Sequence, residues 1–199
     1  MMWSRAPKVT PMRLDYLRKW LEGYLAHDDP GTRLCNLIAL VIVANQPFYP
    51  LYVLAALDRP EPWALLTFLS TPLFAAVPGV ARRSARMGRL LLVLAGIGNT
   101  MLATAIFGPS SGVPVFLIPC VLIVAACFHV EDRWLAVGIL GLAVGLYFGI
   151  ERWKIVPLCT CSPEEESSLT QLHAISASAL VVLIGFALRP KAASAVKRR

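Results

Sequence analysis

Two polar residues and two prolines interrupt the first long apolar run of the sequence. The segment 45–50 reads Asn-Gln-Pro-Phe-Tyr-Pro. Proline has no backbone N–H and kinks a helix, so Pro47 and Pro50 should leave carbonyls of the preceding turn without partners. Broken helices line the binding sites of many membrane transporters, where polar groups face a cavity. We therefore expect a broken helix here, with a pocket beside it.

Further polar side chains lie in other apolar runs, at positions that should share the depth of this segment. Polar groups at membrane depth are costly unless they face protein or water. His173 is the most informative, because a neutral imidazole both donates and accepts hydrogen bonds and titrates near physiological pH. The predicted ligand-binding residues are Asn45, Gln46, Tyr49, Asn99, Thr100, Tyr147 and His173. The alternative is a set of interhelical hydrogen bonds that hold a bundle together.

The histidines and acidic residues form no recognisable cofactor motif. Pairs of histidines can ligate haem, but His129 and His173 fall at opposite ends of a six-span bundle, so one iron cannot reach both. The segments 27–29 and 129–132 each join a histidine to acidic residues. Such groups are plausible transition-metal ligands, but their spacing is not diagnostic, and capping or ion pairing is the simpler explanation. We predict no haem and no metal site.

Cys159 and Cys161 form a C-x-C pair in a polar loop. Thiols oxidise in an oxidising compartment, and a disulfide between these two would close a strained ring. Redox-active pairs usually have the spacing C-x-x-C, so a structural role, paired sulfurs and metal capture all stay open. Motifs of nucleotide-binding, hydrolase and zinc-protease sites are absent. We predict no catalytic residues and a non-enzymatic protein.

The composition indicates a lipid environment. The 199 residues are 57% hydrophobic and 16% charged, whereas soluble domains carry about 25% charged residues. A spanning helix needs about 20 mostly apolar residues. The predicted fold is an all-α polytopic membrane bundle with six transmembrane helices, at 34–57, 62–81, 88–107, 113–130, 134–150 and 169–188. Gly141, Gly145 and Gly149 predict close packing of the fifth helix against a neighbour.

Basic residues fall on one face of this six-span arrangement. Lysine and arginine resist translocation and therefore mark cytoplasmic loops. They cluster in 1–33, 82–89 and 189–199, whereas the loop at 151–168 carries three consecutive glutamates. Both termini are thus expected in the cytoplasm, with the protein in a bacterial-type inner membrane.

A short amphipathic segment precedes the first span. Thr10-Pro11 can begin a helix, with threonine as the N-cap. Over 12–26 the apolar residues Leu14, Leu17 and Leu21 share one face, and basic residues lie largely opposite. Such a helix is expected to lie along the cytoplasmic interface, in contact with anionic lipid headgroups. The predicted organisation is a cytoplasmic segment at 1–33, a transmembrane domain at 34–188 and a basic cytoplasmic tail at 189–199.

The arrangement resembles the six-helix membrane anchors of bacterial class III adenylate cyclases. The matching features are the short basic N-terminal segment, six closely connected spans and the basic segment at 189–199. The resemblance covers roughly residues 10–190 and is architectural. It implies a membrane anchor that acts through another domain or protein. It transfers no catalytic residue, because no cyclase domain lies within these 199 residues.

A non-enzymatic membrane sensor or anchor module with an outward-facing polar pocket is the function that these observations favour. It would act through a partner protein or as a homodimer. The bilayer is a partner by necessity, and nucleic acid is not expected because the basic residues flank apolar runs. The interrupted first span keeps a small transporter or substrate-capturing subunit as the alternative. The cysteine pair and the histidine–acid segments keep a membrane redox or metal-binding protein as a third.

Overall fold

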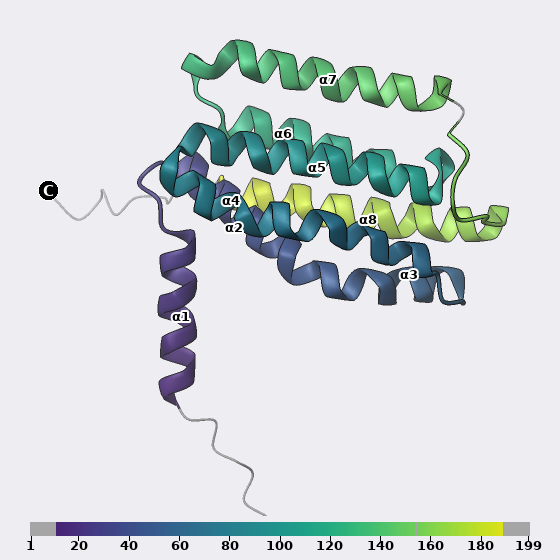
Figure 1. Ribbon diagram of the computed structural model, residues 1–199, viewed down its shortest axis with the longest axis horizontal. Coiled ribbons are helices and arrows are strands. Elements are labelled where there is room, and N and C mark those ends of the chain that lie inside the picture. Colours follow the sequence, from purple (N-terminus) through teal and green to yellow (C-terminus); the bar gives the residue numbers. More distant parts are fainter. Residues whose placement is uncertain (1–10, 154, 189–199) are drawn as a thin grey trace, which may run out of the picture.

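The computed structural model describes residues 11–153 and 155–188, and every regular element within these ranges is a helix (Figure 1). The α-helices are α1 (Pro11–Leu25), α2 (Pro30–Asn45), α3 (Tyr49–Leu57), α4 (Thr71–Arg83), α5 (Ala85–Phe107), α6 (Leu117–Cys127), α7 (Arg133–Arg152) and α8 (Pro163–Ala187). Short 3-10 helices join them: η1 (Gln46–Phe48), η2 (Pro62–Ser70), η3 (Pro109–Ser111), η4 (Val113–Phe116) and η5 (Val130–Asp132). The predicted basic tail at 189–199 lies outside the described residues.

Several of these segments are long and apolar enough to cross a bilayer. Five meet that requirement by length and composition: Pro30–Leu57, Pro62–Arg83, Ala85–Phe107, Val130–Ile150 and Pro163–Ala187. A sixth, Val113–Cys127, is apolar but shorter. It stops before the predicted residue 130 because Phe128 adopts an extended backbone. The prediction of an all-helical fold with several apolar spans is confirmed; six complete crossings stay a prediction.

Two of the long helices begin earlier than hydropathy predicts, because their first turns are capped. The Asp29 side chain accepts a hydrogen bond from the Thr32 backbone N–H at 2.8 Å, so α2 starts at residue 30 rather than 34. Ser162 and Glu165 form a reciprocal capping box, so α8 starts at residue 163 rather than 169. Carboxylates in a first turn also interact favourably with the helix dipole. The glutamate run is thus helical, not loop.

The proline-containing segment is a tightening of the helix and not an unwound break. Residues 46–48 form a 3-10 turn between α2 and α3, and Pro47 and Pro50 each stand at the start of a new helical segment. At that position the missing N–H costs little, since the first N–H groups of a helix have no intrahelical partner. The turn buries Gln46 and leaves Asn45 exposed. The expected broken helix is therefore corrected to a continuous, locally overwound one.

The bundle helices run along a common direction, and two elements lie at its edges (Figure 1). Helix α7 packs mainly on α6, at the edge of the bundle. Helix α1 runs across the bundle direction, at the end where α2 begins and α4 ends. Its C-terminal turn is held there, because Arg82 donates a hydrogen bond to the Gly23 carbonyl at 3.0 Å and Tyr24 donates to the Ala75 carbonyl at 3.2 Å.

A helix therefore occupies the segment that sequence analysis predicts to be amphipathic. Trp20 and Leu21 of α1 are exposed, whereas the side chains of Leu14 and Leu17 lie outside the described residues. The crosswise orientation is the one expected of a helix that lies along a membrane surface. Its interfacial location stays a prediction.

The close helix contact lies between α4 and α5 and not at the glycines of α7. A Cβ atom added to Gly141 or Gly145 would meet nothing within 4 Å, so the predicted packing of that glycine face is wrong within the described structure. The reason is that α7 contacts α6 through other residues. By contrast, a Cβ on Gly88 would lie 2.6 Å from the Ala81 Cβ atom.

We expect Gly88→Ala to destabilise the protein by about 1–3 kcal/mol, the usual cost of overpacking a close contact. The physical reason is that α4 and α5 must separate to admit the methyl group. Gly98→Ala on the same helix is the matched control, because its Cβ would meet nothing within 4 Å. Thermal unfolding of the detergent-purified variants checks this. Equal midpoints for the two variants would contradict the packing argument.

Candidate functional site: a cavity with one polar end

A cavity of about 660 Å³ lies inside the bundle, between α2, α5, α6 and α8. Its volume falls within the range of about 300–1,000 Å³ that is usual for small-molecule sites. Six of the seven residues predicted from sequence line it: Asn45, Gln46, Tyr49, Asn99, Thr100 and His173. These residues come from three stretches that are far apart in the chain, at 45–49, 99–100 and 173. Their role in binding a ligand stays a prediction.

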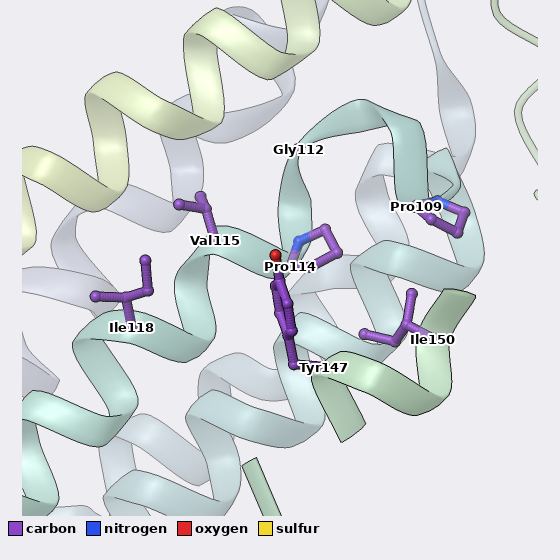
Figure 2. Close-up of a pocket in the computed structure, with 7 residues that line it drawn as sticks. All are labelled: Pro109, Gly112, Pro114, Val115, Ile118, Tyr147 and Ile150. Atoms are coloured by element: carbon purple, nitrogen blue, oxygen red, sulfur yellow. The ribbon is translucent and has the colours of Figure 1, made fainter. Parts of the chain in front are cut away.

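Tyr147, the seventh predicted residue, lies elsewhere. It lines a separate pocket of about 240 Å³ between α7 and the η3–η4–α6 segment (Figure 2). Pro114, Val115 and Ile150 line the same pocket. Because α7 packs on the outside of α6, no residue of α7 is among those that line the larger cavity. The position of a residue along its helix does not determine which neighbouring helix its side chain faces, so the expected convergence of Tyr147 with the other six residues is not found.

His173 bridges two other elements at the polar end of the cavity. Its Nδ1 atom lies 2.7 Å from the Ser111 carbonyl, which can only accept, so Nδ1 carries the proton. In a neutral imidazole the other nitrogen is then an acceptor, and the Tyr49 hydroxyl donates to Nε2 at 3.0 Å. The His173 side chain is 1% exposed and lies among the rings of Tyr49, Phe107 and Phe116. The imidazole is thus fully bonded and fixed in one tautomer.

Gln46 is the centre of a second polar network. Its amide nitrogen donates to the Thr67 carbonyl at 3.1 Å and to the Ser70 hydroxyl at 2.8 Å. Its amide oxygen accepts a hydrogen bond from the Thr71 hydroxyl. Ser70 also lies 2.8 Å from the Asn99 amide oxygen. The network ties the 3-10 turn after α2 to η2, α4 and α5, so much of the predicted polar cluster is also structural.

The remainder of the cavity is apolar. The residues that line it towards the other end of the bundle include Val41, Ile42, Phe74, Leu92, Ile123, Leu180 and Leu183. No lysine, arginine, aspartate or glutamate is among the described residues that line it. The cavity therefore joins an uncharged hydrogen-bonding end to an apolar end.

The partners that hold this polar end in place are not among the residues predicted from the sequence. Ser111 contributes a backbone carbonyl, and Thr67, Ser70 and Thr71 contribute hydroxyl or carbonyl groups. Serine and threonine in apolar runs often form hydrogen bonds between helices. The run Thr67–Thr71 therefore carried a usable signal, whereas a backbone carbonyl such as that of Ser111 carries none.

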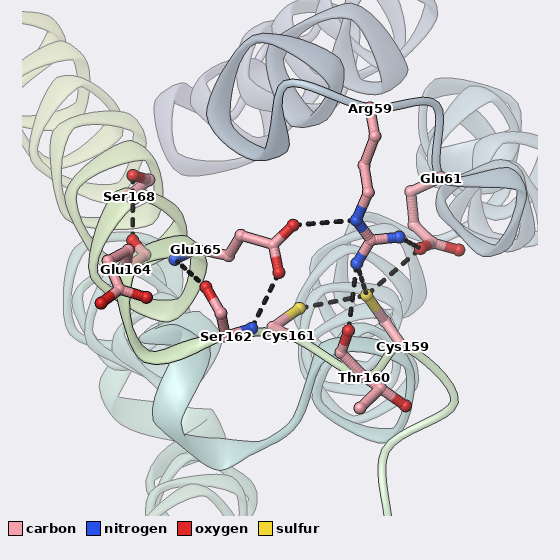
Figure 3. A network of polar contacts seen from close by, with 9 residues as sticks. All are labelled: Arg59, Glu61, Cys159, Thr160, Cys161, Ser162, Glu164, Glu165 and Ser168. Carbon is pink, nitrogen blue, oxygen red and sulfur yellow. Dashed lines mark hydrogen bonds and ion pairs between the residues drawn. The ribbon is translucent and has the colours of Figure 1, made fainter.

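An arginine network closes the end of the bundle beyond this polar cluster (Figure 3). Arg59 donates to Glu165 at 2.8 Å, to Glu61 at 3.0 Å and to the Thr160 carbonyl at 3.0 Å. Its hydrogen bond with Glu165, followed by its contact with Cys159, raises the pKa of the guanidinium. The network connects the loop after α3 to the loop that precedes α8.

Cys159 and Cys161 are free thiols in this network, with their sulfur atoms 3.1 Å apart. Burial, together with hydrogen bonds to Cys161 and Glu61, raises the pKa of the Cys159 thiol to about 12. A thiol with such a pKa is almost entirely protonated at neutral pH and is a poor nucleophile. The local environment is thus unlike that of a catalytic redox cysteine.

We expect Cys159 to react slowly with maleimides at pH 8, because little of it is thiolate and the side chain is buried. Cys161 is partly exposed and is the internal comparison. Mass spectrometry of peptides from the intact membrane-embedded protein gives both rates. Modification of Cys159 as fast as Cys161 would contradict the buried, protonated state.

The opposite end of the bundle holds a second charged cluster. Arg89 of α5 contacts Asp29 at 2.6 Å and Asp132 at 3.2 Å, and His129 lies 3.1 Å from Asp29. Burial opposes ionisation of Asp29, but hydrogen bonds from Thr32 and the nearby Arg89 charge lower its pKa to about 2. The two histidine–acid segments noted in the sequence thus meet as ion pairs. Among the described residues no group of three or more metal-binding side chains is placed to hold an ion.

The long apolar helices point to a multi-pass membrane protein. The sequence model of the MASE7 family matches residues 22–196, which is most of the chain. The chain therefore belongs to MASE7, a family of membrane-associated sensors. No curated protein and no solved structure matches it. The family agrees with the expected membrane anchor, and the link to adenylate cyclases stays a prediction.

Proposed function

We propose that this chain is the membrane-embedded sensor part of a signalling system in a bacterial-type inner membrane. It crosses the membrane six times with both ends in the cytoplasm. It binds a ligand in the cavity. The conformational change that follows is transmitted to a partner protein or within a homodimer. The observation that carries the proposal is the cavity between the helices, with its fixed polar end.

The six-crossing topology is supported by the charged clusters at the two ends of the bundle. Asp29, Arg89 and Asp132 precede or begin α2, α5 and α7, so these three helices start at one end. Arg59 and Glu165 join the end of α3 to the start of α8 at the other end. The basic residues after α4 lie at the first end, as expected for a cytoplasmic face. Anionic headgroups would contact α1 there.

Helix α8 is the element suited to carry the response. Its first half contributes His173 to the polar end, and Leu180 and Leu183 line the apolar end. From His173 to its last residue, Ala187, α8 continues for about 21 Å at about 1.5 Å per residue. A ligand that displaces α8 by about 1–2 Å would produce a shift of the size that interface helices show in known switches. That shift would appear at the cytoplasmic end.

The test is to fill the cavity with a larger side chain and to measure the distance between α5 and α8 at the proposed cytoplasmic end. Spin labels at Met87→Cys and Ala187→Cys, both exposed, report the distance between α5 and α8 in nanodiscs. A Cys161→Ser background limits labelling to these sites. Ser176→Trp fills the cavity, and Ser178→Trp on the exposed face of the same helix is the matched control.

We expect Ser176→Trp, and not Ser178→Trp, to shift the distance by about 1–2 Å or to broaden its distribution. Coincident distributions in the two variants would overturn a sensor that works through α8. A transporter would instead move solute across liposomes, and cavity filling would abolish that movement without a need for coupling to the cytoplasmic end.

A further inference from the structure

We propose that the cavity binds a neutral amphiphile that arrives through the bilayer. Its head carries a hydrogen-bond-accepting oxygen, such as a carbonyl or hydroxyl, and its tail is aliphatic. This inference rests on the proposed sensor function and names the ligand class for the same site.

The polar end holds amide donors that are not used in hydrogen bonds between the described residues. His173 donates its only ring proton to the Ser111 carbonyl, and Tyr49 donates its hydroxyl proton to Nε2 of His173. Thr100 donates to the Gly96 carbonyl. The amide nitrogens of Asn45 and Asn99 donate to no other residue in the described part of the chain, since only their oxygens take part in hydrogen bonds. Two carboxamide donors beside a tyrosine oxygen match a neutral oxygen acceptor.

The absence of charge around the cavity excludes ionic head groups. The lining within the described ranges holds no cation for a carboxylate or phosphate and no anion for an ammonium group. A charge moved into such surroundings without a partner loses its hydration and gains no ion pair. A neutral head group does not have this loss of charge hydration.

The apolar end is long enough for an aliphatic tail. Leu92 and Ala103 both line the cavity from α5, and Leu172 and Leu183 both line it from α8. Each pair spans about 16 Å at about 1.5 Å per residue. The polar residues of both helices lie in the half nearer Ala103 and Leu172. The ligand would therefore lie along the bundle with its head towards the Arg59 end.

The cavity reaches the surface of the bundle between α2 and α8. Val41 of α2 and Ile175 and Ala179 of α8 line it and are also exposed. These residues lie within apolar helices that are long enough to cross a membrane, so the opening faces acyl chains and not water. A lipid-soluble molecule can therefore reach the site laterally.

The test compares three probes of similar length in nanodiscs: 2-tridecanone, dodecanoate and dodecylammonium. We expect 2-tridecanone alone to raise the midpoint of thermal unfolding by several degrees, because binding to the folded state stabilises it. Asn99→Leu should weaken this binding about tenfold, the effect of losing one hydrogen bond of about 1.4 kcal/mol. Ser70 can still donate to the Thr67 carbonyl in that variant, so its own fold is preserved.

A second pair of variants separates binding in the cavity from solubility in the lipid. Leu183→Trp fills the apolar end and should abolish the stabilisation. Val182→Trp, on the neighbouring exposed position of α8, should retain it. Equal stabilisation by dodecanoate or dodecylammonium would contradict the proposal that the head group of the ligand is neutral. Equal stabilisation of both tryptophan variants would show that 2-tridecanone does not bind in the cavity. A diacyl phospholipid that is retained tightly and is not displaced by 2-tridecanone would also contradict the proposed ligand.

These results are independent of the sensor test. If 2-tridecanone fails to bind while Ser176→Trp still shifts the distance from Met87 to Ala187, the ligand class is wrong and the sensor function stands. If 2-tridecanone binds as expected and the distance is unchanged in Ser176→Trp, the ligand class stands and signalling through α8 is wrong.

Discussion

In Arg89→Met we expect a loss of about 3–5 kcal/mol of stability, the usual cost of removing one partner from a buried ion pair. The Arg89 side chain is 4% exposed and contacts Asp29, Asp132 and the Thr32 hydroxyl. It also lies 5.9 Å from the centre of the Phe128 ring. Methionine would leave two nearby carboxylates without their shared cation, and the starts of α2, α5 and α7 would lose their common contact.

Arg86→Met is the matched control, because Arg86 contacts the same Asp132 at 3.0 Å but is 60% exposed. Exposed ion pairs contribute about 0–1 kcal/mol, so this variant should unfold near the wild-type midpoint. Thermal unfolding in detergent compares the two. Similar losses in both variants would show that burial does not determine the strength of this cluster.

The same cluster makes a prediction for pH dependence. Because the pKa of Asp29 is lowered to about 2 in the folded state, its ionised form favours folding at any pH above the unfolded value of about 3.9. This contribution is lost as the pH falls from about 4 towards about 2. Wild-type stability should therefore change little through Asp29 between pH 5 and pH 8 and decline in more acidic buffer, as unfolding midpoints measured across that range would show.

In His173→Phe we expect a loss of about 1–3 kcal/mol, because the Ser111 carbonyl and the Tyr49 hydroxyl would both lose a buried partner. The phenyl ring keeps most of the volume, so the change isolates hydrogen bonding from packing. Tyr49→Phe should cost less, because it removes only one of the two hydrogen bonds of His173.

The double variant Tyr49→Phe with His173→Phe measures the direct contact between the two side chains. Hydrogen bonds between membrane helices have coupling energies of about 0.6 kcal/mol, with a maximum of about 1.7 kcal/mol. Coupling in this range supports the proton assignment in which Tyr49 donates to Nε2. Strict additivity would mean that the two rings do not share a hydrogen bond in the membrane.

A ligand site and a purely structural network at the polar end predict different effects of Asn99→Leu on stability and on the binding of 2-tridecanone. A purely structural network predicts that Asn99→Leu lowers stability and leaves the response to 2-tridecanone as it is. A ligand site predicts nearly unchanged stability and about tenfold weaker binding of 2-tridecanone. Gln46, with three hydrogen bonds to protein groups, belongs mainly to the structural part, whereas Asn99 retains free donors.

The sequence by itself determined the helices and their approximate ends. Hydropathy depends on consecutive residues, so runs of about 20 apolar residues are visible without any tertiary contact. The charge asymmetry around Arg82–Arg89 and the polar residues at 45–49, 99–100 and 173 were visible for the same reason. The caps at Asp29 and Ser162 are also local, and the helix starts differed from expectation because hydropathy does not detect them.

Only the tertiary structure decided which faces of the helices meet. Tyr147 lies beside the η3–η4 segment, and the packing of α7 on the outside of α6 turns it towards a different pocket from the one predicted. Arg89 meets acids 60 and 43 residues away, and His173 meets a carbonyl 62 residues away. Such pairings depend on the rotation of each helix about its axis and on its neighbours. These are set by packing across the whole bundle, which no window of consecutive residues contains.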